Sequence, residues 1–252
     1  MQFSFAGKTA LVTGGSSGIG AATCRMLAEG GAAVAINYFR GREAAESLAG
    51  ELRAKGAEVM TVQADVTNRD EVRRMVDEVH GTLGKIGLLV HGAGNILGRA
   101  TIVEETGDLW QRTLDLNLNS VLWVTQAVVP DMIEQKWGKI VTISSRAGRD
   151  GGSRGVGAYA VAKAGLMVLT KVMAKEYGEY NINANCVVPG WIDTPFHVKA
   201  GSGDLQRFAK DMPLQRIGTP EEVASVIVFL LSEASSYMTG AMLDVNAGML
   251  MP

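Results

Sequence analysis

The chain has 252 residues, a length that fits one domain and should bury roughly three quarters of the unfolded surface on folding. Its formal net charge is -2 and no Lys/Arg cluster is interleaved with aromatic residues, which argues against a nucleic-acid-binding protein. Its three histidines and two cysteines are scattered without the spacing of metal ligands, so we predict no catalytic metal.

The N-terminus and the hydropathy pattern predict a soluble, cytoplasmic protein. The first eight residues lack a basic stretch followed by an apolar one, and no run reaches the roughly 18 apolar residues of a membrane span. Cys24 and Cys186 lie far apart, in a predicted helix and a predicted strand. We therefore interpret them as small buried residues in a reducing compartment rather than as a disulfide.

Short β-branched runs alternate with longer amphipathic stretches along the whole chain, a pattern typical of βαβ units. We predict a single α/β domain over residues 1–252, with a doubly wound parallel sheet (Rossmann fold) of about seven strands and helices on both faces. Functional residues are expected at the carboxyl ends of the strands, and residues 195–212 are interpreted as a mobile substrate loop. The predicted strands are Thr9–Thr13, Ala32–Tyr38, Glu58–Gln63, Gly87–His91, Gly138–Ser144, Ile182–Val188 and Ala241–Val245.

A glycine-rich turn directly follows the first predicted strand and opens a helix. Glycine permits positive φ and close backbone approach, and the N–H groups at a helix start suit a pyrophosphate. The alternative is a tight turn without a ligand, but the position after the first strand favours phosphate binding. The residues assigned to this site are Gly14, Ser16, Ser17, Gly18, Ile19 and Gly20.

Tyr159 and Lys163 lie four residues apart in a later predicted helix, so both side chains share one face and can act on one substrate atom. A phenol with a reference pKa of about 10 is a poor base at neutral pH until a nearby cation stabilises the phenolate. Lys163 can supply that cation. Taken alone, the pair also fits an ordinary helical contact.

The spacing Thr-Gly-x-x-x-Gly-x-Gly of the first turn, with the Tyr-x-x-x-Lys pair, resembles the short-chain dehydrogenase/reductase family, and the resemblance extends over nearly the whole chain. It implies an NAD(P)(H)-dependent oxidoreductase that acts on a carbonyl or a secondary alcohol, with Tyr159 as general acid/base. It also implies cofactor contacts at three later strand ends. These are Asp65 and Val66, then Gly92, Ala93 and Gly94, then Pro189, Gly190, Ile192 and Thr194.

The same resemblance implies roles for the remaining catalytic residues. Lys163 would also bind the nicotinamide ribose, Ser145 would donate a hydrogen bond to the substrate oxygen, and Asn117 would hold a water that links Lys163 to solvent. Ser144 is the alternative to Ser145, and the Ala-Gly pair that follows two residues later favours Ser145. Asn117 considered alone also fits a packed polar residue of a helix.

His91 and Gly92 stand where the family has two asparagines, so two amide side chains are missing from that strand end. For His91 we favour a buried histidine with satisfied nitrogens over a catalytic role.

The end of the second predicted strand bears on the choice between NADP(H) and NAD(H). Members of the family that prefer NAD usually carry an acidic residue there, because a carboxylate accepts from the ribose 2′-OH and repels a 2′-phosphate. Here Tyr38 takes that position, and Arg40, together with Arg42, can form charge-assisted hydrogen bonds to a 2′-phosphate. We therefore favour NADP(H), with NAD(H) as the alternative.

The resemblance leaves the substrate open among 3-oxoacyl thioesters, sugars and other ketones. We expect the substrate pocket to include Ile96, Leu97, Trp191, the loop after Ser145 and the 196–212 segment. Its polar candidates are Arg146, Arg149, Asp150, Arg154 and His197. Similar enzymes are commonly tetramers, so a homo-oligomer is expected, formed by helices near 108–134 and 157–179 and by the last strand region.

Two alternatives belong to other functional classes. The first is a non-catalytic dinucleotide-sensing regulator of the same fold, which the intact Ser145, Tyr159 and Lys163 disfavour because a sensor needs no tuned phenol. The second is a lyase or epimerase, whose family members resemble a different glycine spacing and carry an extra substrate domain.

Overall fold

The computed structural model describes residues 3–199 and 204–251, and within them seven parallel strands form one sheet in the order β3-β2-β1-β4-β5-β6-β7. The chain adds β2 and β3 on one side of β1 and then crosses to β4 on the other side. The order therefore reverses between β1 and β4. The strands are β1 (Thr9–Thr13), β2 (Ala33–Tyr38), β3 (Val59–Gln63), β4 (Ile86–His91), β5 (Gly138–Ile143), β6 (Ile182–Pro189) and β7 (Met242–Val245).

The predicted α/β fold is confirmed, and all seven predicted strands are present. β1 has the predicted bounds, and each of the others differs from its prediction by one residue at one end. These differences fall at the ends of the strands, where the series of backbone hydrogen bonds between neighbouring strands stops. Glu58 and Ala241, for example, each accept one backbone hydrogen bond from the neighbouring strand without belonging to β3 or β7.

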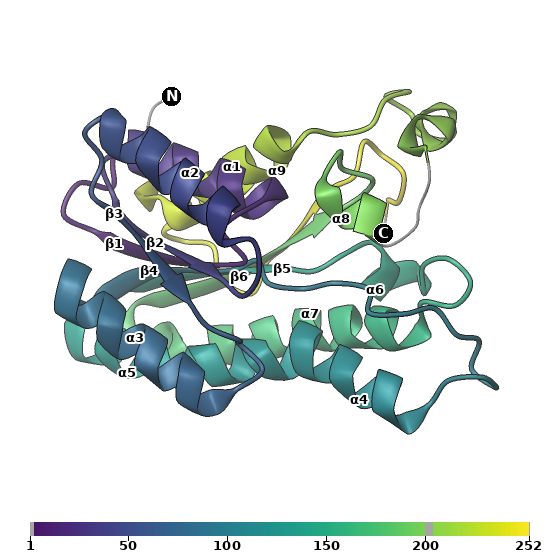
Figure 1. The fold of residues 1–252 in the computed structure, drawn as a ribbon, viewed down its shortest axis with the longest axis horizontal. Helices are drawn as coiled ribbons and strands as arrows, with labels where there is room; N and C mark the ends of the chain where they lie inside the picture. Colours follow the sequence, from purple (N-terminus) through teal and green to yellow (C-terminus); the bar gives the residue numbers. More distant parts are fainter. Residues whose placement is uncertain (1–2, 200–203, 252) are drawn as a thin grey trace.

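The helices form a layer on each face of the sheet (Figure 1). One face is covered by α1 (Gly18–Glu29), α2 (Arg42–Ala54) and α9 (Pro220–Leu231), the other by α3 (Arg69–Leu83), α4 (Gly107–Leu114), α5 (Ser120–Gln135) and α7 (Gly157–Tyr177). The shorter helices are the π-helix η1 (Asp115–Asn119), α6 (Ala147–Asp150), α8 (Pro195–Lys199), and the 3₁₀ turns η2 (Gly178–Tyr180), η3 (Leu205–Asp211) and η4 (Glu233–Ser235).

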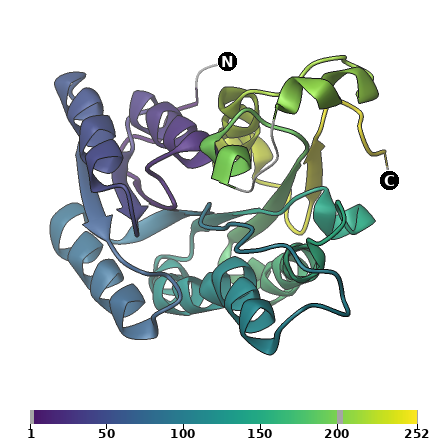
Figure 2. The ribbon, with the colours of Figure 1, turned by 45° about the vertical axis from the view of Figure 1, so that its right-hand side comes forward.

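A separate apolar core fills the space between the sheet and each helical layer. Leu27 of α1 and Ile227 of α9 belong to one core, whereas Met75 of α3 and Met132 of α5 belong to the other, and all four are fully buried. Because both faces of the sheet are covered, the strands are apolar without alternation, as the sequence indicated. The open end of this sandwich, which Figure 2 brings forward, is where the loops after β4, β5 and β6 gather.

Residues 157–180, which comprise α7 and the turn after it, are long and apolar enough to cross a membrane by length and composition. More than half of the most apolar window, 56%, is buried inside the fold. α7 is therefore a core helix of the lower layer.

The two edge strands of the sheet, β3 and β7, differ in how far side chains cover their backbone acceptors. On β3, the carbonyl oxygen of Val59 accepts from Nε of Arg53 at 2.8 Å, and that of Gln63 accepts from Nη2 of Arg74. These guanidinium groups cover backbone acceptors that another strand would need. On β7, at the opposite edge, all four residues are only partly buried.

Of the predicted substrate loop 195–212, residues 200–203 lie outside the described residues. The described parts contain α8 and η3.

Candidate active site

A crevice of about 350 Å³ runs along the carboxyl ends of the strands, over the point where the strand order reverses. Ligands of open α/β sheets bind at such a point. Of the residues predicted to bind the cofactor or to take part in catalysis, the crevice brings together all but Arg42 and Asn117, and Asn117 lies behind it. From those predictions it is lined by Gly14, Ser16, Ser17, Gly18, Ile19, Gly20, Tyr38, Arg40, Asp65, Val66, Gly92, Ala93, Gly94, Ser145, Tyr159, Lys163, Pro189, Gly190, Ile192 and Thr194.

The glycine-rich turn fits a pyrophosphate. Gly14 and Gly18 have φ of +63° and +52°, which side-chain-bearing residues rarely adopt, and a Cβ on Gly20 would lie 2.3 Å from the carbonyl oxygen of Gly14. Ser17, the N-cap residue of α1, makes no side-chain capping bond, and the first turn of the helix has no acidic residue. The N–H groups at this helix start are therefore not capped by a side chain and suit an anionic group.

Two residues that the sequence analysis did not single out hold this turn in place. The hydroxyl oxygen of Thr13 accepts from the backbone N–H groups of Gly92 and Ala93 at 3.2 and 3.3 Å, which joins the ends of β1 and β4. Buried Asn37, near the end of β2, accepts from the Gly14 N–H at 3.4 Å and donates to the Ala64 carbonyl at 3.2 Å. Thr13 is the first residue of the glycine motif, so the sequence could have identified it. Nothing in the sequence distinguishes Asn37 from any other strand residue.

The end of the crevice at β2 and β3, where the sequence predicts the adenosine contacts, combines one acidic and one basic side chain; we call it the adenosine end. One carboxylate oxygen of Asp65 accepts from the N–H and the hydroxyl of Thr67, at 2.9 and 2.7 Å, which fixes the carboxylate at the end of β3. Arg40 is exposed and lines the crevice beside the buried Tyr38.

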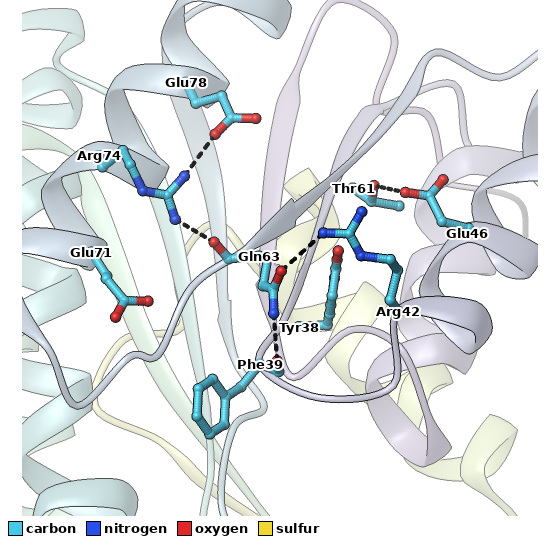
Figure 3. Close-up of a pocket in the computed structure, with 9 residues that line it drawn as sticks. All are labelled: Tyr38, Phe39, Arg42, Glu46, Thr61, Gln63, Glu71, Arg74 and Glu78. Carbon is cyan, nitrogen blue, oxygen red and sulfur yellow. Dashed lines mark hydrogen bonds and ion pairs between the residues drawn. The ribbon is translucent and has the colours of Figure 1, made fainter.

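A second hollow of about 610 Å³ lies beside the adenosine end, between α2 and α3 at the edge strand β3 (Figure 3). Arg42 lines this hollow and donates to the side chain of Gln63 at 3.1 Å. Most of the polar side chains there are paired with one another or with backbone, as Thr61 is with Glu46. The two arginines that the sequence placed together are thus separated, with Arg40 at the crevice and Arg42 in the neighbouring hollow.

Tyr159 and Lys163 project from the first two turns of α7, as their spacing predicted, and both are buried. Nζ of Lys163 lies 5.6 Å from the centre of the Tyr159 ring and donates to the Ile143 carbonyl at 2.8 Å. Burial raises the pKa of Tyr159 to about 12, against the opposing effect of a hydrogen bond with Ser145. Burial also lowers the pKa of Lys163 to about 8. In the protein alone, the phenol is therefore a neutral acid at pH 7, and Lys163 is largely protonated.

The two serines after β5 have different surroundings. The Ser144 hydroxyl is buried and donates to the Lys163 carbonyl at 2.7 Å, so it braces the backbone of α7. Ser145 lines the crevice beside Tyr159, and its hydroxyl oxygen accepts from the Ala147 N–H at 3.1 Å. The geometry favours Ser145 over Ser144 as the residue that faces a substrate.

Asn117 lies in the π-helix η1, which separates α4 from α5, and is fully buried. Its side chain accepts from the Asn95 N–H at 3.1 Å and donates to the Asn95 carbonyl at 2.9 Å. A Cβ on Gly94 would lie 2.8 Å from the Asn117 amide oxygen and 3.2 Å from Nζ of Lys163. Glycine at position 94 therefore lets the amide and the ammonium group approach the same stretch of backbone. The amide itself braces the loop after β4.

His91 is buried at the end of β4, as we favoured, and its Nε2 lies 3.1 Å from the Thr125 hydroxyl. Burial and, to a smaller extent, the charge of Lys163 lower the pKa of His91 to about 3. His91 is therefore neutral at pH 7 and is held by the Thr125 contact.

The segment after β6, where the sequence predicts the nicotinamide contacts, lines the other end of the crevice. The Gly190 N–H donates to the Val245 carbonyl at 3.0 Å, and a Cβ at position 190 would lie 2.9 Å from the Asn246 backbone. The methyl group of Thr194 packs near Gly18 of the glycine-rich turn, which brings two distant parts of the chain together across the crevice.

Beyond Ser145 and Tyr159 the crevice opens into a small chamber of about 50 Å³, which we call the substrate chamber. Of the polar candidates from the sequence, only Arg146 and His197 line it. Arg149 instead pairs with Asp244 of β7, at 3.0 and 2.8 Å. The chamber is lined by Ile96, Arg99, Ser145, Arg146, Ala147, Gly152, Ser153, Val156, Tyr159, Gly190, Trp191, Phe196 and His197.

The expectation that Leu97 lines the pocket is wrong. Its neighbour Ile96 lines the chamber, whereas Leu97 is 37% exposed and does not.

Known proteins with related sequences and structures match the chain over nearly its full length. A family model described as enoyl-(acyl carrier protein) reductase matches residues 14–250. A 3-oxoacyl-[acyl-carrier-protein] reductase of Thermotoga maritima is 39% identical over 244 residues, which cover 97% of this chain and 98% of the relative.

Two solved structures are similarly close. A short-chain type dehydrogenase/reductase from Mycobacterium marinum has a TM-score of 0.93 and 34% identity, with 100% of this chain and 98% of that chain covered. A putative gluconate dehydrogenase from Agrobacterium tumefaciens has a TM-score of 0.92 and 32% identity, with 100% and 99% covered.

The buried His91 predicts a sensitivity of the fold to acid. Its pKa of about 3 lies below the unfolded value of about 6.5, so the unfolded chain takes up a proton that the folded chain excludes, and stability falls as the pH drops below 6.5. Between pH 7.5 and pH 4.5, the wild type should lose roughly 2 to 3 kcal/mol more unfolding free energy than His91→Asn. Urea denaturation at a series of pH values measures this, and parallel pH profiles would contradict it. If His91→Asn does not fold, His91→Gln serves instead.

Proposed function

The chain belongs to the short-chain dehydrogenase/reductase family, and on that premise we propose that it reduces a 3-oxoacyl compound with NADP(H), with Tyr159 as the proton donor. Its class is that of an NAD(P)-dependent oxidoreductase acting on a carbonyl group or secondary alcohol. The proposal concerns the residues, the preferred dinucleotide and the substrate.

The observation that carries this proposal is the position of Ser145 and Tyr159, which line both the dinucleotide crevice and the substrate chamber. When bound in the crevice, NADPH supplies a hydride to a carbonyl carbon. Two hydroxyl groups side by side at the chamber wall can hold the carbonyl oxygen and polarise the bond. The Tyr159 proton then passes to that oxygen, which becomes the alcohol.

The protonation states of the buried pair at neutral pH supply what carbonyl reduction needs. With a pKa of about 12, Tyr159 keeps the proton that reduction requires. Lys163, with a pKa of about 8, is mostly a cation at pH 7 and stabilises the phenolate that remains after the transfer. In the reverse reaction the same cation would help Tyr159 to act as a base.

The adenosine end supports NADP(H) as the favoured cofactor. Tyr38 stands where a carboxylate would repel a 2′-phosphate, and Arg40 lines the crevice beside it. Asp65, the acidic residue at this end, is held by Thr67 at the end of the neighbouring strand.

The 3-oxoacyl class is supported by the names of the relatives rather than by fold alone, because one scaffold hosts many functions. The family model is described as an enoyl reductase, which acts on a carbon–carbon double bond. Hydroxyl donors at Ser145 and Tyr159 favour a carbonyl, since the reacting group then has an oxygen to accept them. The same donors argue against a dinucleotide sensor, because a protein that catalyses no reaction does not need them.

We also propose that the protein acts in the cytoplasm as a homo-oligomer. Exposed apolar side chains occur along α5 and α7, namely Leu122, Val161, Val168 and Val172, with exposed fractions between 38 and 62%. An apolar row of this kind on neighbouring helices suits a second copy of the chain. The partly buried edge strand β7 offers a second contact region.

The catalytic assignment predicts different outcomes for three variants. Tyr159→Phe should lower kcat for ketone reduction by about 10² to 10⁴ with little change in NADPH affinity, because the proton donor alone is lost. Ser145→Ala should lower kcat by about 10², whereas the matched variant Ser144→Ala should stay within about threefold because Ser144 faces the α7 backbone. NADPH absorbance with a panel of 3-oxoacyl thioesters, sugars and simple ketones measures these rates. Full turnover in Ser145→Ala would refute its role.

The dinucleotide preference predicts a difference between the two neighbouring arginines. Arg40→Ala should weaken NADPH binding by about tenfold to a hundredfold, the value of a charge-assisted hydrogen bond, and leave NADH binding nearly unchanged. Arg42→Ala, which alters the adjacent hollow, should have a smaller effect. Fluorescence titration of each dinucleotide tests this, and tighter NADH than NADPH binding in the wild type would overturn the preference.

The oligomer predicts that a charge on the helical face separates the subunits. Val168→Glu should lower the sedimentation coefficient at micromolar concentration, because a buried unpaired carboxylate is costly at an apolar contact. Val103→Glu, at a valine that is 96% exposed on a loop, is the control and should not change it. A wild type that sediments as a monomer would contradict the proposal.

A further inference from the structure

The charged residues that line the substrate chamber are all basic. Its two charged lining residues among those described are Arg99 and Arg146, and no Asp or Glu lines it. His197, which also lines it, has its pKa lowered to about 4 by burial and is neutral at pH 7. The chamber wall therefore carries positive charge next to the two catalytic hydroxyl groups.

Arg146 follows Ser145 directly, so its guanidinium group is delivered to the chamber by the same turn that positions the catalytic serine. Its side chain is only 16% exposed and lies over the Trp191 ring, 5.4 Å from the ring centre. One of its five N–H donors reaches Asp150, one turn along α6. Asp150 does not line the chamber, and its other oxygen accepts from the Gly152 N–H. The other N–H donors of the guanidinium group can therefore bind a planar anion.

Trp191 also lines this wall, and its ring holds a second donor close behind the surface. Its indole N–H is buried and has no hydrogen-bond acceptor among the described residues. The ring itself is held firmly, since it stacks on Phe208 with 4.2 Å between centres and an angle of 4°. A buried donor without an acceptor is costly in a folded protein, and an oxygen brought by the substrate would relieve that cost.

The chamber is small and open on one side. Its volume of about 50 Å³ beside Ser145 and Tyr159 is enough for a group about as large as a carboxylate, and a longer chain would extend through the open side. Two donors and positive charge favour an anionic group over an apolar one.

We propose that Arg146 and Trp191 form an anion subsite, and that the preferred substrate is a small oxo acid with a free carboxylate close to the reacting ketone. This inference rests on the proposed carbonyl reduction and narrows its substrate. Within the 3-oxoacyl class, it means that the free acid is preferred to the neutral ester or thioester of the same carbon skeleton. The alcohol form of the substrate is the corresponding hydroxy acid.

The test compares 3-oxobutanoate with its methyl ester and its N-acetylcysteamine thioester as substrates for NADPH oxidation. In the wild type, kcat/KM for the acid should exceed that for either neutral compound by about tenfold or more, as one charge-assisted contact allows. Arg146→Leu should lose about a hundredfold on the acid and less than threefold on the ester. Trp191→Phe keeps the ring and its stacking and should lose about tenfold on the acid.

Arg154→Leu is the matched control, because Arg154 is an exposed arginine of the same loop that does not line the chamber. It should leave both substrates unchanged. A wild type that reduces the ester or thioester as well as the acid overturns the inference. So does an equal loss on acid and ester in Arg146→Leu.

A binding measurement separates failure of this inference from failure of the proposed function. Calorimetry of 3-hydroxybutanoate and its methyl ester with the Tyr159→Phe protein and NADPH needs no turnover. Stronger binding of the acid that is lost in Arg146→Leu supports the subsite even if no ketone is reduced. Turnover abolished by Tyr159→Phe, together with equal binding of acid and ester, supports the reductase and refutes the subsite.

Discussion

The site depends on how closely β1 and β4 approach at the point where the strand order reverses. The Thr13 hydroxyl oxygen accepts from two successive N–H groups after β4, and a Cβ on Gly14 would lie 2.9 Å from the Ala93 backbone. This contact fixes the first turn against the fourth strand end, and both line the same crevice. The glycines are needed because two backbones meet here. The crevice is thus a product of strand order and of two or three small residues.

Burial then sets the chemistry of the residues at the other side of the crevice. The spacing of Tyr159 and Lys163 predicts that the Lys163 cation makes the phenol a better base, but in the protein alone the loss of solvent is the larger effect and raises the pKa of the phenol. The same loss of solvent lowers the pKa of Lys163 and of His91. Three titratable groups in one buried region are therefore arranged so that Lys163 alone carries a charge at pH 7.

The parts of the site that follow from local chain geometry could be predicted from the sequence. The glycine-rich turn, the spacing of Tyr159 and Lys163, and the strand ends each depend on a few consecutive residues. The roles of the arginines could not be predicted, because they depend on partners far along the chain. Arg149 faces away from the chamber through a pair with Asp244, 95 residues later, and Arg42 is drawn into the neighbouring hollow by Gln63. The Asn37 contacts likewise join three strands that only the folded sheet brings together.

The unequal edges of the sheet restrict how copies of this chain can assemble. Arg53 and Arg74 occupy backbone acceptors on β3, whereas β7 has no comparable guanidinium contact among the described residues. A contact between β7 of one copy and β7 of another would use the edge without this cover. Such a contact is self-complementary and closes on itself, unlike a head-to-tail contact of β7 with β3, which would grow into fibres.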